Sequence, residues 1–362
     1  MKKTALFEKH TALNAKIAPF GGYQMPIQYQ GILREHNATR TACAVFDTCH
    51  MGEFLIEGDT AVEDLEKVLS CDVASLGVGA CRYGFLCNET GGVLDDQILY
   101  RLGPQQFMMV VNSATQEADF SWIDSHRSSK TGLNNISEQT GKIDIQGPLS
   151  AKIVNSILSE SIEDLRFYRF GHNYYDGEKV LVSRTGYTGE LGFELYCSNG
   201  AAMKIWDECI GRGASPAGLG ARDTLRLEMG FPLYGHELSA NINAGESGFS
   251  RAISSNKDFI GSAHLKNHGL QNKLVGIRLD GKRAAREGDL IEVNGRSVGF
   301  ITSGSYSPSL ECAIALGYVE MIHSQRHTPV SIKGKRIDTE GIVTDLPFYK
   351  QGTVRADLKS CL

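Results

Sequence analysis

The C-terminal part of the chain carries the pattern that most restricts its fold. From about Lys273, short β-rich runs follow one another with turn residues between them: LVGIRLDG, DLIEVNGRSVGFITSG, CAIALGYVE, TPVSIKGKRI and TEGIVTDLPF. Asn294-Gly295 is a strong hairpin signal, because both residues tolerate the positive φ angles of a tight turn, and Lys333-Gly334-Lys335 suggests a second hairpin. Runs this short and closely spaced predict a closed or nearly closed antiparallel β-barrel domain over residues 273–362.

The residues before this barrel predict a mixture of helices and strands. A helix capped by Asp59 is expected to carry apolar positions 62, 65, 68 and 69 on one face, and a second amphipathic helix is expected over residues 202–211. Strands are expected at 53–57, 93–102, 107–112, 179–184 and 193–197. Because helices and strands do not alternate regularly, the fold class is α+β rather than a doubly wound sheet.

Charge and cysteine content exclude several classes of function. The 362 residues carry 37 basic and 42 acidic side chains, so the chain lacks the basic footprint of a nucleic-acid or membrane binder. Nine cysteines occur without a CxxC pair, and the histidines show no ligand spacing, which argues against a disulfide framework and a metal site. The N-terminus MKKTALFEKHTALNAK lacks a signal-peptide core, and no segment has the ~18 apolar residues of a membrane span. We therefore expect a cytoplasmic location and no metal.

Two adjacent carboxylates stand near the start of one expected strand, GGVLDDQILYRL at residues 91–102. Side chains alternate faces in a strand, so Asp96 shares an apolar, aromatic face while Asp95 lies on a mixed polar face, where we expect it to be solvated or paired with arginine. A carboxylate on an apolar face is costly unless donors or positive charge reach it. The loop at 103–106 returns the chain into FMMVVN and brings Asn112 near Asp96 as such a donor. A buried structural aspartate held by backbone amides is the alternative.

Motifs along the whole chain resemble one protein family. They are LFEKH (6–10), FGGYQMPIQY (20–29), FDTCHMGEF (46–54), GGVLDDQILYRL, MMVVNSAT (108–115), QGP (146–148), SRTGYTGELGFEL (183–195), GLGARDTLRLE (218–228), NKDFIG (256–261), GKRAAREG (281–288), ITSGSYSPSL (301–310) and PFY (347–349). In this order they resemble the T-protein family of the glycine cleavage system, the folate-dependent aminomethyltransferases. The resemblance implies a multidomain cloverleaf-like folate-binding fold, with two intertwined α+β subdomains in residues 1–272 before the C-terminal barrel.

The resemblance also implies an activity and a site. The family passes the methylene of an aminomethyl group, carried on the lipoyl arm of H-protein, to the co-substrate tetrahydrofolate and releases ammonia. Its essential acid matches Asp96, which we expect to act by orientation and electrostatics because an aspartate of ordinary pKa, ~3.9, is a weak base. The implied folate contacts are Met51, Tyr83, Tyr100, Asn112, Tyr187, Glu194, Arg222 and Tyr349.

Among these, Glu194 matches the acceptor of the pterin edge and Arg222 a ligand-binding arginine. From the residues alone, Glu194 could equally be an exposed strand residue, and Arg222 could pair with Asp223 or Glu228. The basic cluster Lys282, Arg283 and Arg286 is a candidate for steering an acidic H-protein. Arg251 stands where the family commonly has tryptophan.

Two other functions remain open from the sequence. The first is a folate-dependent demethylase acting on a small sulfonium or methoxy substrate, which would turn over a free small molecule instead of requiring H-protein. The second is a non-catalytic folate-binding factor for iron–sulfur assembly. Members of that second group resemble one another around a Lys-Gly-Cys-Tyr motif, whereas this chain has Arg184-Thr185-Gly186-Tyr187 at the corresponding place and keeps Asp96.

Overall fold

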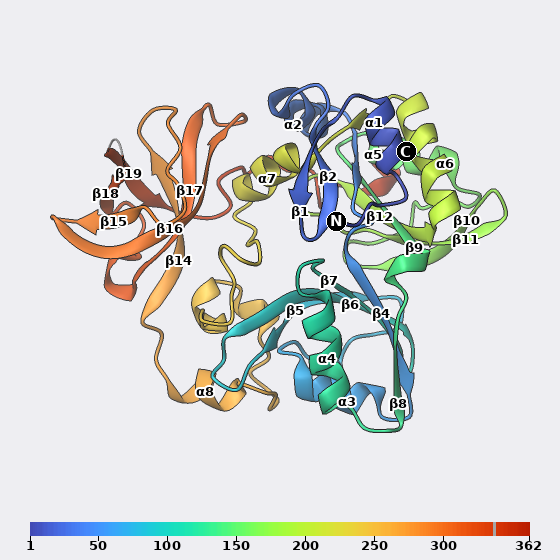
Figure 1. The fold of residues 1–362 in the computed structure, drawn as a ribbon, viewed down its shortest axis with the longest axis horizontal. Helices are drawn as coiled ribbons and strands as arrows, with labels where there is room; N and C mark the ends of the chain where they lie inside the picture. The colour runs from blue at the N-terminus through green and yellow to red at the C-terminus, as the bar shows by residue number, and fades with distance from the viewer. Residues whose placement is uncertain (336–337) are drawn as a thin grey trace.

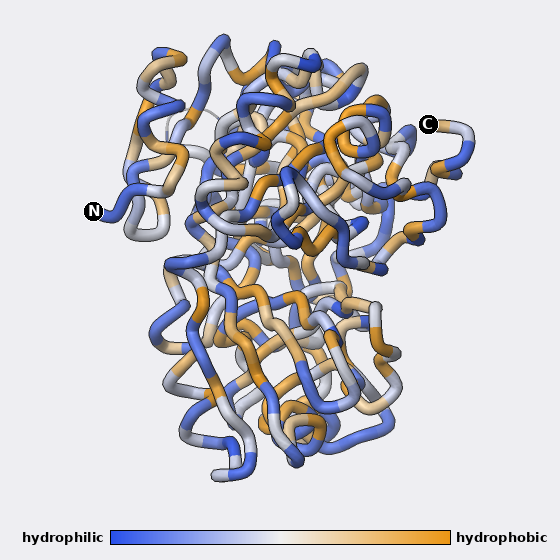
Figure 2. The backbone as a smooth tube through the Cα atoms, turned by 90° about the vertical axis from the view of Figure 1, so that its right-hand side faces the viewer, coloured by the Kyte–Doolittle hydropathy of each residue, from blue (hydrophilic) through white to orange (hydrophobic). Residues whose placement is uncertain are grey.

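Strands gather into three lobes in the computed structural model, which describes residues 1–335 and 338–362 (Figure 1). One lobe is a β-barrel, and the other two are each built on a sheet. Seen from the side, the two sheet lobes lie one above the other, and apolar stretches run through their strands (Figure 2). An isolated antiparallel β-bridge between Ala80 and Arg169 joins the two sheet lobes.

The lower lobe in Figure 1 is an antiparallel five-stranded sheet in the order β5-β6-β7-β4-β8. Its strands are β4 (Gly52–Gly58), β5 (Cys81–Cys87), β6 (Val93–Gly103), β7 (Gln106–Val111) and β8 (Thr131–Asn135). Helices α3 (Ala61–Val68) and α4 (Gln116–His126) pack on it. The expected capping of α3 by Asp59 is wrong: Thr60 precedes the helix, and no side chain caps it, since Thr60 instead bonds to its neighbours Asp64 and Ser128.

The upper lobe is a six-stranded sheet in the order β10-β11-β12-β9-β3-β13. Its strands are β3 (Ala44–Asp47), β9 (Thr140–Gln146), β10 (Phe170–Tyr175), β11 (Glu178–Ser183), β12 (Gly192–Ser198) and β13 (Ser215–Pro216). Helices α5 (Ser150–Ile157) and α6 (Asn199–Gly211) cover it around the buried Trp206. The predicted helix ending at Gly211 is confirmed and begins three residues earlier than expected, where Ser198 Oγ accepts the N–H of Ala201.

Shorter elements connect the lobes. The hairpin of β1 (Lys16–Phe20) and β2 (Tyr23–Gln28) lies near the middle of Figure 1, with α1 (Phe7–Ala12), α2 (Ile32–Thr41) and α7 (Leu219–Glu228) beside it. Helix α8 (Ser262–Asn267) precedes the barrel, and the short 3₁₀ turns are Ser137–Gln139, Ala244–Ser247, Ser250–Ala252, Met321–His323 and Leu358–Ser360.

The third lobe is the closed barrel expected from the turn pattern, which confirms the fold class. Strands β14 (Asn272–Leu279), β15 (Leu290–Val293), β16 (Arg296–Ser307), β17 (Cys312–Glu320), β18 (Pro329–Lys333) and β19 (Thr339–Thr344) close in the order β14-β17-β16-β15-β18-β19. Asn294 and Gly295 have φ of 53° and 77°, as a tight hairpin turn requires. Strands β18 and β19 pair antiparallel, and the second predicted turn runs into residues 336–337, outside the described residues.

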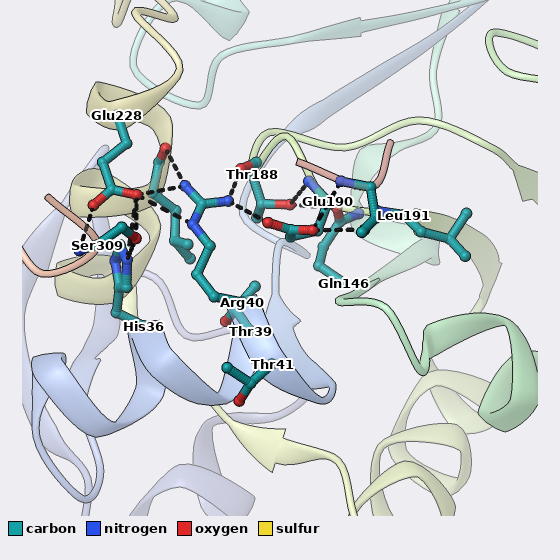
Figure 3. Close-up of polar contacts among 12 residues, drawn as sticks. His36, Thr39, Arg40, Thr41, Gln146, Thr188, Glu190, Leu191, Glu228 and Ser309 are labelled. Atoms are coloured by element: carbon teal, nitrogen blue, oxygen red, sulfur yellow. Dashed lines mark hydrogen bonds and ion pairs between the residues drawn. The ribbon is translucent and has the colours of Figure 1, made fainter. Parts of the chain in front are cut away.

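A buried charge network ties the barrel to the upper lobe (Figure 3). Arg40 on α2 contacts Glu228 Oε2 at 2.8 Å and Glu190 Oε1 at 2.8 Å, and Ser309 donates to Glu228 Oε2 at 2.8 Å. Burial alone would raise the pKa of Glu228, but hydrogen bonding and charge from His36 and Arg40 lower it to about 2. The network therefore fixes α2, α7 and the start of the β16–β17 connection against one another.

Candidate functional site

Asp96 lies on β6 with two side-chain donors directed at its carboxylate. Tyr83 on the neighbouring strand β5 donates its hydroxyl to Asp96 Oδ2 at 2.9 Å, and Asn112 donates Nδ2 to Asp96 Oδ1 at 2.9 Å. Asn112 directly follows β7, the hairpin partner of β6, so its expected approach to Asp96 is confirmed. Both donors are side chains, in contrast to the alternative of a carboxylate held by neighbouring backbone amides.

The surroundings of Asp96 change its acidity. Burial raises its pKa, the neighbouring Asp95 carboxylate raises it further, and the two donors offset only part, so the pKa of Asp96 is about 7. The expectation of an ordinary, weakly basic aspartate is therefore wrong. A carboxyl group with a pKa near neutrality changes charge in the physiological range and is suited to proton transfer as well as to charge stabilisation.

Asp95 differs from the prediction more strongly. It is 0% exposed and accepts both the backbone N–H of Asn112 at 3.0 Å and Asn112 Nδ2 at 2.8 Å, so it is neither solvated nor paired with arginine. The two acids do lie on opposite faces of the strand, as alternation predicts, but the expected exposure of Asp95 is wrong because the sheet is covered on both faces. Helices α3 and α4 cover the face that holds Asp95 and Leu99, whereas the face of Asp96 and Ile98 turns toward the upper lobe.

Glu194 on β12 is buried, at 4% exposed, which rules out the exposed-strand alternative. Lys142 on β9 contacts Glu194 Oε1 at 2.7 Å, and the Thr185 hydroxyl donates to Oε2. Burial would raise the pKa of Glu194, but Lys142, by its charge and hydrogen bond, together with the Thr185 hydroxyl and the charge of Arg222, outweighs burial and holds the pKa below its usual value. Glu194 is thus an ionised acceptor deep between the sheets.

Arg222 on α7 points toward the same region. Its guanidinium contacts Asp144 Oδ2 at 2.8 Å and lies 4.8 Å from the ring centroid of Tyr187, which rules out the alternative of a pair with Asp223 or Glu228. Those two acids bind Arg226 and Arg40 instead. Burial and the charge of Glu194 raise the pKa of Asp144 to about 6, against the lowering effect of Arg222.

Aromatic and thioether side chains line this region. Met51 receives Lys142 Nζ at 3.1 Å and packs with the fully buried Tyr100, whose hydroxyl lies 3.0 Å from that of Tyr196. Tyr187 stacks on Phe231 with ring centroids 5.7 Å apart. Tyr83 connects this wall to the carboxylate through its hydrogen bond to Asp96 Oδ2.

A cavity of about 230 Å³ adjoins the aromatic wall. Phe231 and Phe249 line it, and these two rings are also the partners of Tyr187 and Tyr83 respectively. Phe249 lies 6.1 Å from the Tyr83 ring, whereas Arg251, two residues later, is exposed. The aromatic support for Tyr83 therefore comes from Phe249, and the arginine does not interrupt it.

Tyr349 is placed apart from the other expected site residues. Its ring lies 4.2 Å from the Arg40 guanidinium, and its backbone N–H donates to the Glu228 carbonyl at 2.9 Å. Phe348, its neighbour in the PFY motif, packs with barrel residues. The structure thus brings Asp96, Tyr83 and Asn112 into one cluster, groups Met51, Tyr100 and Glu194 in a second, and joins Arg222 to Tyr187, with Tyr349 on the Arg40 network.

Several polar residues of this region were missed by the sequence reasoning. Lys142, Asp144 and Gln146 alternate with Ile143 and Ile145 along β9 and bind Glu194, Arg222 and the Thr185 carbonyl respectively. The run KIDIQ carries a period-two polar signal that could have indicated them. Among the described residues, no cluster of three or more His, Cys, Asp and Glu side chains is arranged to hold a metal ion, and no helix is long and apolar enough to cross a membrane.

Comparisons with known proteins agree with this architecture. Residues 6–257 match the family model described as the GCVT N-terminal domain, and residues 272–350 match the glycine cleavage T-protein C-terminal barrel domain. A carboxylate-centred site between two α+β lobes, followed by this barrel, defines a transferase of the aminomethyltransferase class. The chain belongs to the glycine cleavage T-protein family.

Individual relatives cover nearly all of the chain. The aminomethyltransferase of Halothermothrix orenii is 41% identical over 356 residues, which are 96% of this chain and 100% of the relative. That of Thermotoga maritima is 40% identical and covers 99% of this chain and 100% of the relative. The crystal structure of glycine cleavage system aminomethyltransferase T from Bartonella henselae superposes with a TM-score of 0.91 at 31% identity, covering 97% of this chain and 99% of that one.

Proposed function

We propose that this chain transfers the methylene of an aminomethyl group, bound as a thioether to the lipoyl arm of H-protein, to tetrahydrofolate, with release of ammonia. The observation that carries the proposal is the Asp96 carboxylate, held between Tyr83 and Asn112 with a pKa of about 7 beside an aromatic wall. The division of the chain into a folate-binding region, residues 1–272, and a barrel unit, residues 273–362, belongs to the same proposal.

Asp96 stabilises the charge that develops when the carbon–sulfur bond breaks. Loss of the thiolate leaves an iminium-like carbon, and a carboxylate ~4 Å away at an effective dielectric of ~20 stabilises a unit positive charge by about 4 kcal/mol. Tyr83 and Asn112 hold the carboxylate in place, so no reorientation is needed during the reaction. With a pKa of about 7, Asp96 can also accept the proton that the attacking folate nitrogen loses.

The polar groups of the site fit the chemistry of tetrahydrofolate. The pterin edge offers a ring N–H beside an amino group, which an ionised carboxylate accepts at two oxygens, and Glu194 is such a carboxylate. Lys142 and Thr185 orient it and leave each oxygen a further lone pair. Arg222 supplies positive charge for an acceptor oxygen or carboxylate, and Met51, Tyr83 and Tyr187 supply apolar walls.

H-protein is the proposed partner that delivers the lipoyl arm. Lys282, Arg283 and Arg286 are all exposed at the connection that follows β14, where they can attract an acidic surface. Such exposed charges act mainly on the rate of association and make it depend on salt. A cytoplasmic location fits the nine cysteines, all of which are free thiols.

Ammonia release from aminomethylated, lipoylated H-protein, measured with and without tetrahydrofolate, tests the proposal. The expected result is release that tetrahydrofolate accelerates, with methylenetetrahydrofolate as the second product. Turnover of a free methylated sulfonium or methoxy compound without H-protein would instead identify the demethylase, and folate binding without either turnover would identify the non-catalytic factor.

A further inference from the structure

Asp119, on the first turn of α4, meets Asp95 beneath the strand that carries Asp96. Asp119 is 2% exposed and lies within side-chain hydrogen-bonding reach of Asp95, which is itself 0% exposed. The Thr115 hydroxyl is also within reach of both carboxyls, but its single hydrogen is directed to the Asn112 carbonyl at 3.1 Å. Asp119 Oδ2 is buried and receives no N–H or O–H donor from the described residues. Two carboxyl groups in hydrogen-bond contact need a proton between them, because two buried anions at that distance repel strongly.

The side chains around Asp95 and Asp119 offset only part of the cost of burying two carboxyl groups together. Besides one another, the carboxyl groups of Asp95, Asp96 and Asp119 have three tyrosines as titratable neighbours. These are Tyr83 on β5, Tyr187 in the loop after β11 and Tyr234 in the loop after α7. The tyrosines are neutral near pH 7, since burial raises the pKa of Tyr234 to about 12 and that of Tyr83 well above its usual value. Burial and the Asp95 charge raise the pKa of Asp119 to about 10, so the shared proton stays with this pair.

Asn112 connects the buried pair to Asp96. The Asn112 amide nitrogen lies 2.8 Å from Asp95 Oδ1 and 2.9 Å from Asp96 Oδ1, so its two hydrogens are divided between the two acids. Asp95 Oδ2 also accepts the backbone N–H of Asn112 at 3.0 Å. The orientation of the Asn112 amide, and therefore of the donor that Asp96 receives, depends on where Asp95 holds its oxygens.

We propose that Asp119 is a positioning residue that, as a neutral acid, donates to Asp95 and so fixes the Asp95–Asn112–Asp96 chain in its reactive arrangement. This inference rests on the proposed transfer of the aminomethyl group's methylene, because it assigns Asp119 a part in holding the acid of that reaction. Asp119 touches no substrate in this scheme; it acts through Asp95, on the sheet face that α4 covers, and through Asn112, which reaches Asp96 on the other face. Its effect is on geometry, and a displacement of a reacting group by ~1 Å can cost as much as a hundredfold in rate.

The test compares three variants of the full chain with wild type. Asp119→Ala removes the donor, Asp119→Asn keeps one because an amide N–H replaces the acid O–H, and Glu117→Gln makes the same chemical change on the exposed side of the same helical turn. We expect Asp119→Ala to lower kcat at least about tenfold while the KM for tetrahydrofolate stays within about threefold. Asp119→Asn and Glu117→Gln should keep kcat within about threefold of wild type.

A measurement without turnover keeps this test separate from the test of the activity. The side-chain amide signals of Asn112 in ¹⁵N-labelled protein should shift in Asp119→Ala and remain near their wild-type positions in Asp119→Asn. If wild type lacks the transferase activity, the proposed function fails while these signals still report on Asp119. If Asp119→Ala does not fold, wild-type Asn112 signals should move with pH as Asp119 loses its proton above about pH 9, and those of Asp119→Asn should not.

Three results would overturn the inference. The first is an Asp119→Ala protein that folds and keeps wild-type kcat and Asn112 signals. The second is an Asp119→Asn protein as impaired as Asp119→Ala, which would mean that a negative charge, not a donated proton, is required. The third is a set of wild-type Asn112 signals that do not respond to pH in the range where Asp119 should ionise.

Discussion

Replacing Asp96 by asparagine removes the charge of the site while keeping the shape of the side chain. The amide oxygen can still accept Asn112 Nδ2, and the amide nitrogen can face the Tyr83 hydroxyl, which is able to accept as well as donate. Loss of about 4 kcal/mol of charge stabilisation corresponds to roughly a thousandfold in rate. Because the amide dipole retains part of this, we expect Asp96→Asn to lower kcat at least about a hundredfold, with the affinity for tetrahydrofolate within about threefold.

The same substitution should make the protein more stable, which separates a catalytic effect from misfolding. Since the pKa of Asp96 rises from 3.8 to about 7 on folding, ionising it costs stability as pH rises between about 4 and 7. Asp96→Asn avoids this cost, so at pH 8 its free energy of unfolding should exceed that of wild type by up to about 4 kcal/mol, and the difference should vanish near pH 4.

Ammonia release in single turnovers and urea denaturation at pH 4 and pH 8 measure the two effects. Glu117→Gln, an acid-to-amide change on an exposed face, is the control and should alter neither. The reasoning would be refuted by an Asp96→Asn protein that reacts within tenfold of wild type, or by one that loses stability at pH 8 in proportion to its loss of activity.

Three further predictions follow from the contacts of the site and of the Arg40 network. Tyr83→Phe removes a donor that lowers the pKa of Asp96, so the pH–rate curve should move to higher pH by up to about one unit; a move to lower pH would contradict this. Lys142→Met leaves Glu194 buried without its cation, so unfolding should become easier by about 3–5 kcal/mol and tetrahydrofolate binding weaker by at least about tenfold, as denaturation and titration would measure; unchanged affinity would contradict the role of Glu194. Glu228→Gln should cost about 2–5 kcal/mol at pH 7, and the difference from wild type in acid denaturation should fade as pH drops from about 5 to about 2, because the pKa of Glu228 is lowered on folding; a difference independent of pH would count against the network.

Local patterns in the sequence were sufficient for some parts of this structure. The barrel followed from short strands separated by turn residues, and Asn294 and Gly295 adopt the backbone angles that their residue types favour. The approach of Asn112 to Asp96 followed from one short hairpin, in which strand pairing leaves little freedom. These features depend on neighbours in the chain, which periodicity and turn chemistry describe directly.

Other parts depended on elements that only the complete fold brings together. The burial of Asp95 required α4 to cover a face of β6 that reads as polar in the sequence, and Asp119 on that helix supplies its partner. Likewise, Lys142 and Glu194 are far apart in sequence and meet because β9 and β12 pair antiparallel. Tyr349 was expected with the folate contacts, and only the position of α2 explains why its ring meets Arg40.

The pH dependence of the chemical step tests the central role of Asp96 most directly. In single turnovers with aminomethylated H-protein and saturating tetrahydrofolate, the wild-type rate should rise about tenfold per pH unit below 7 and level off above it, with a midpoint near the pKa of about 7, while the residual rate of Asp96→Asn should not follow this curve. A wild-type rate that is constant from about pH 5.5 to 8.5, or that falls as pH rises through 7, would contradict the account.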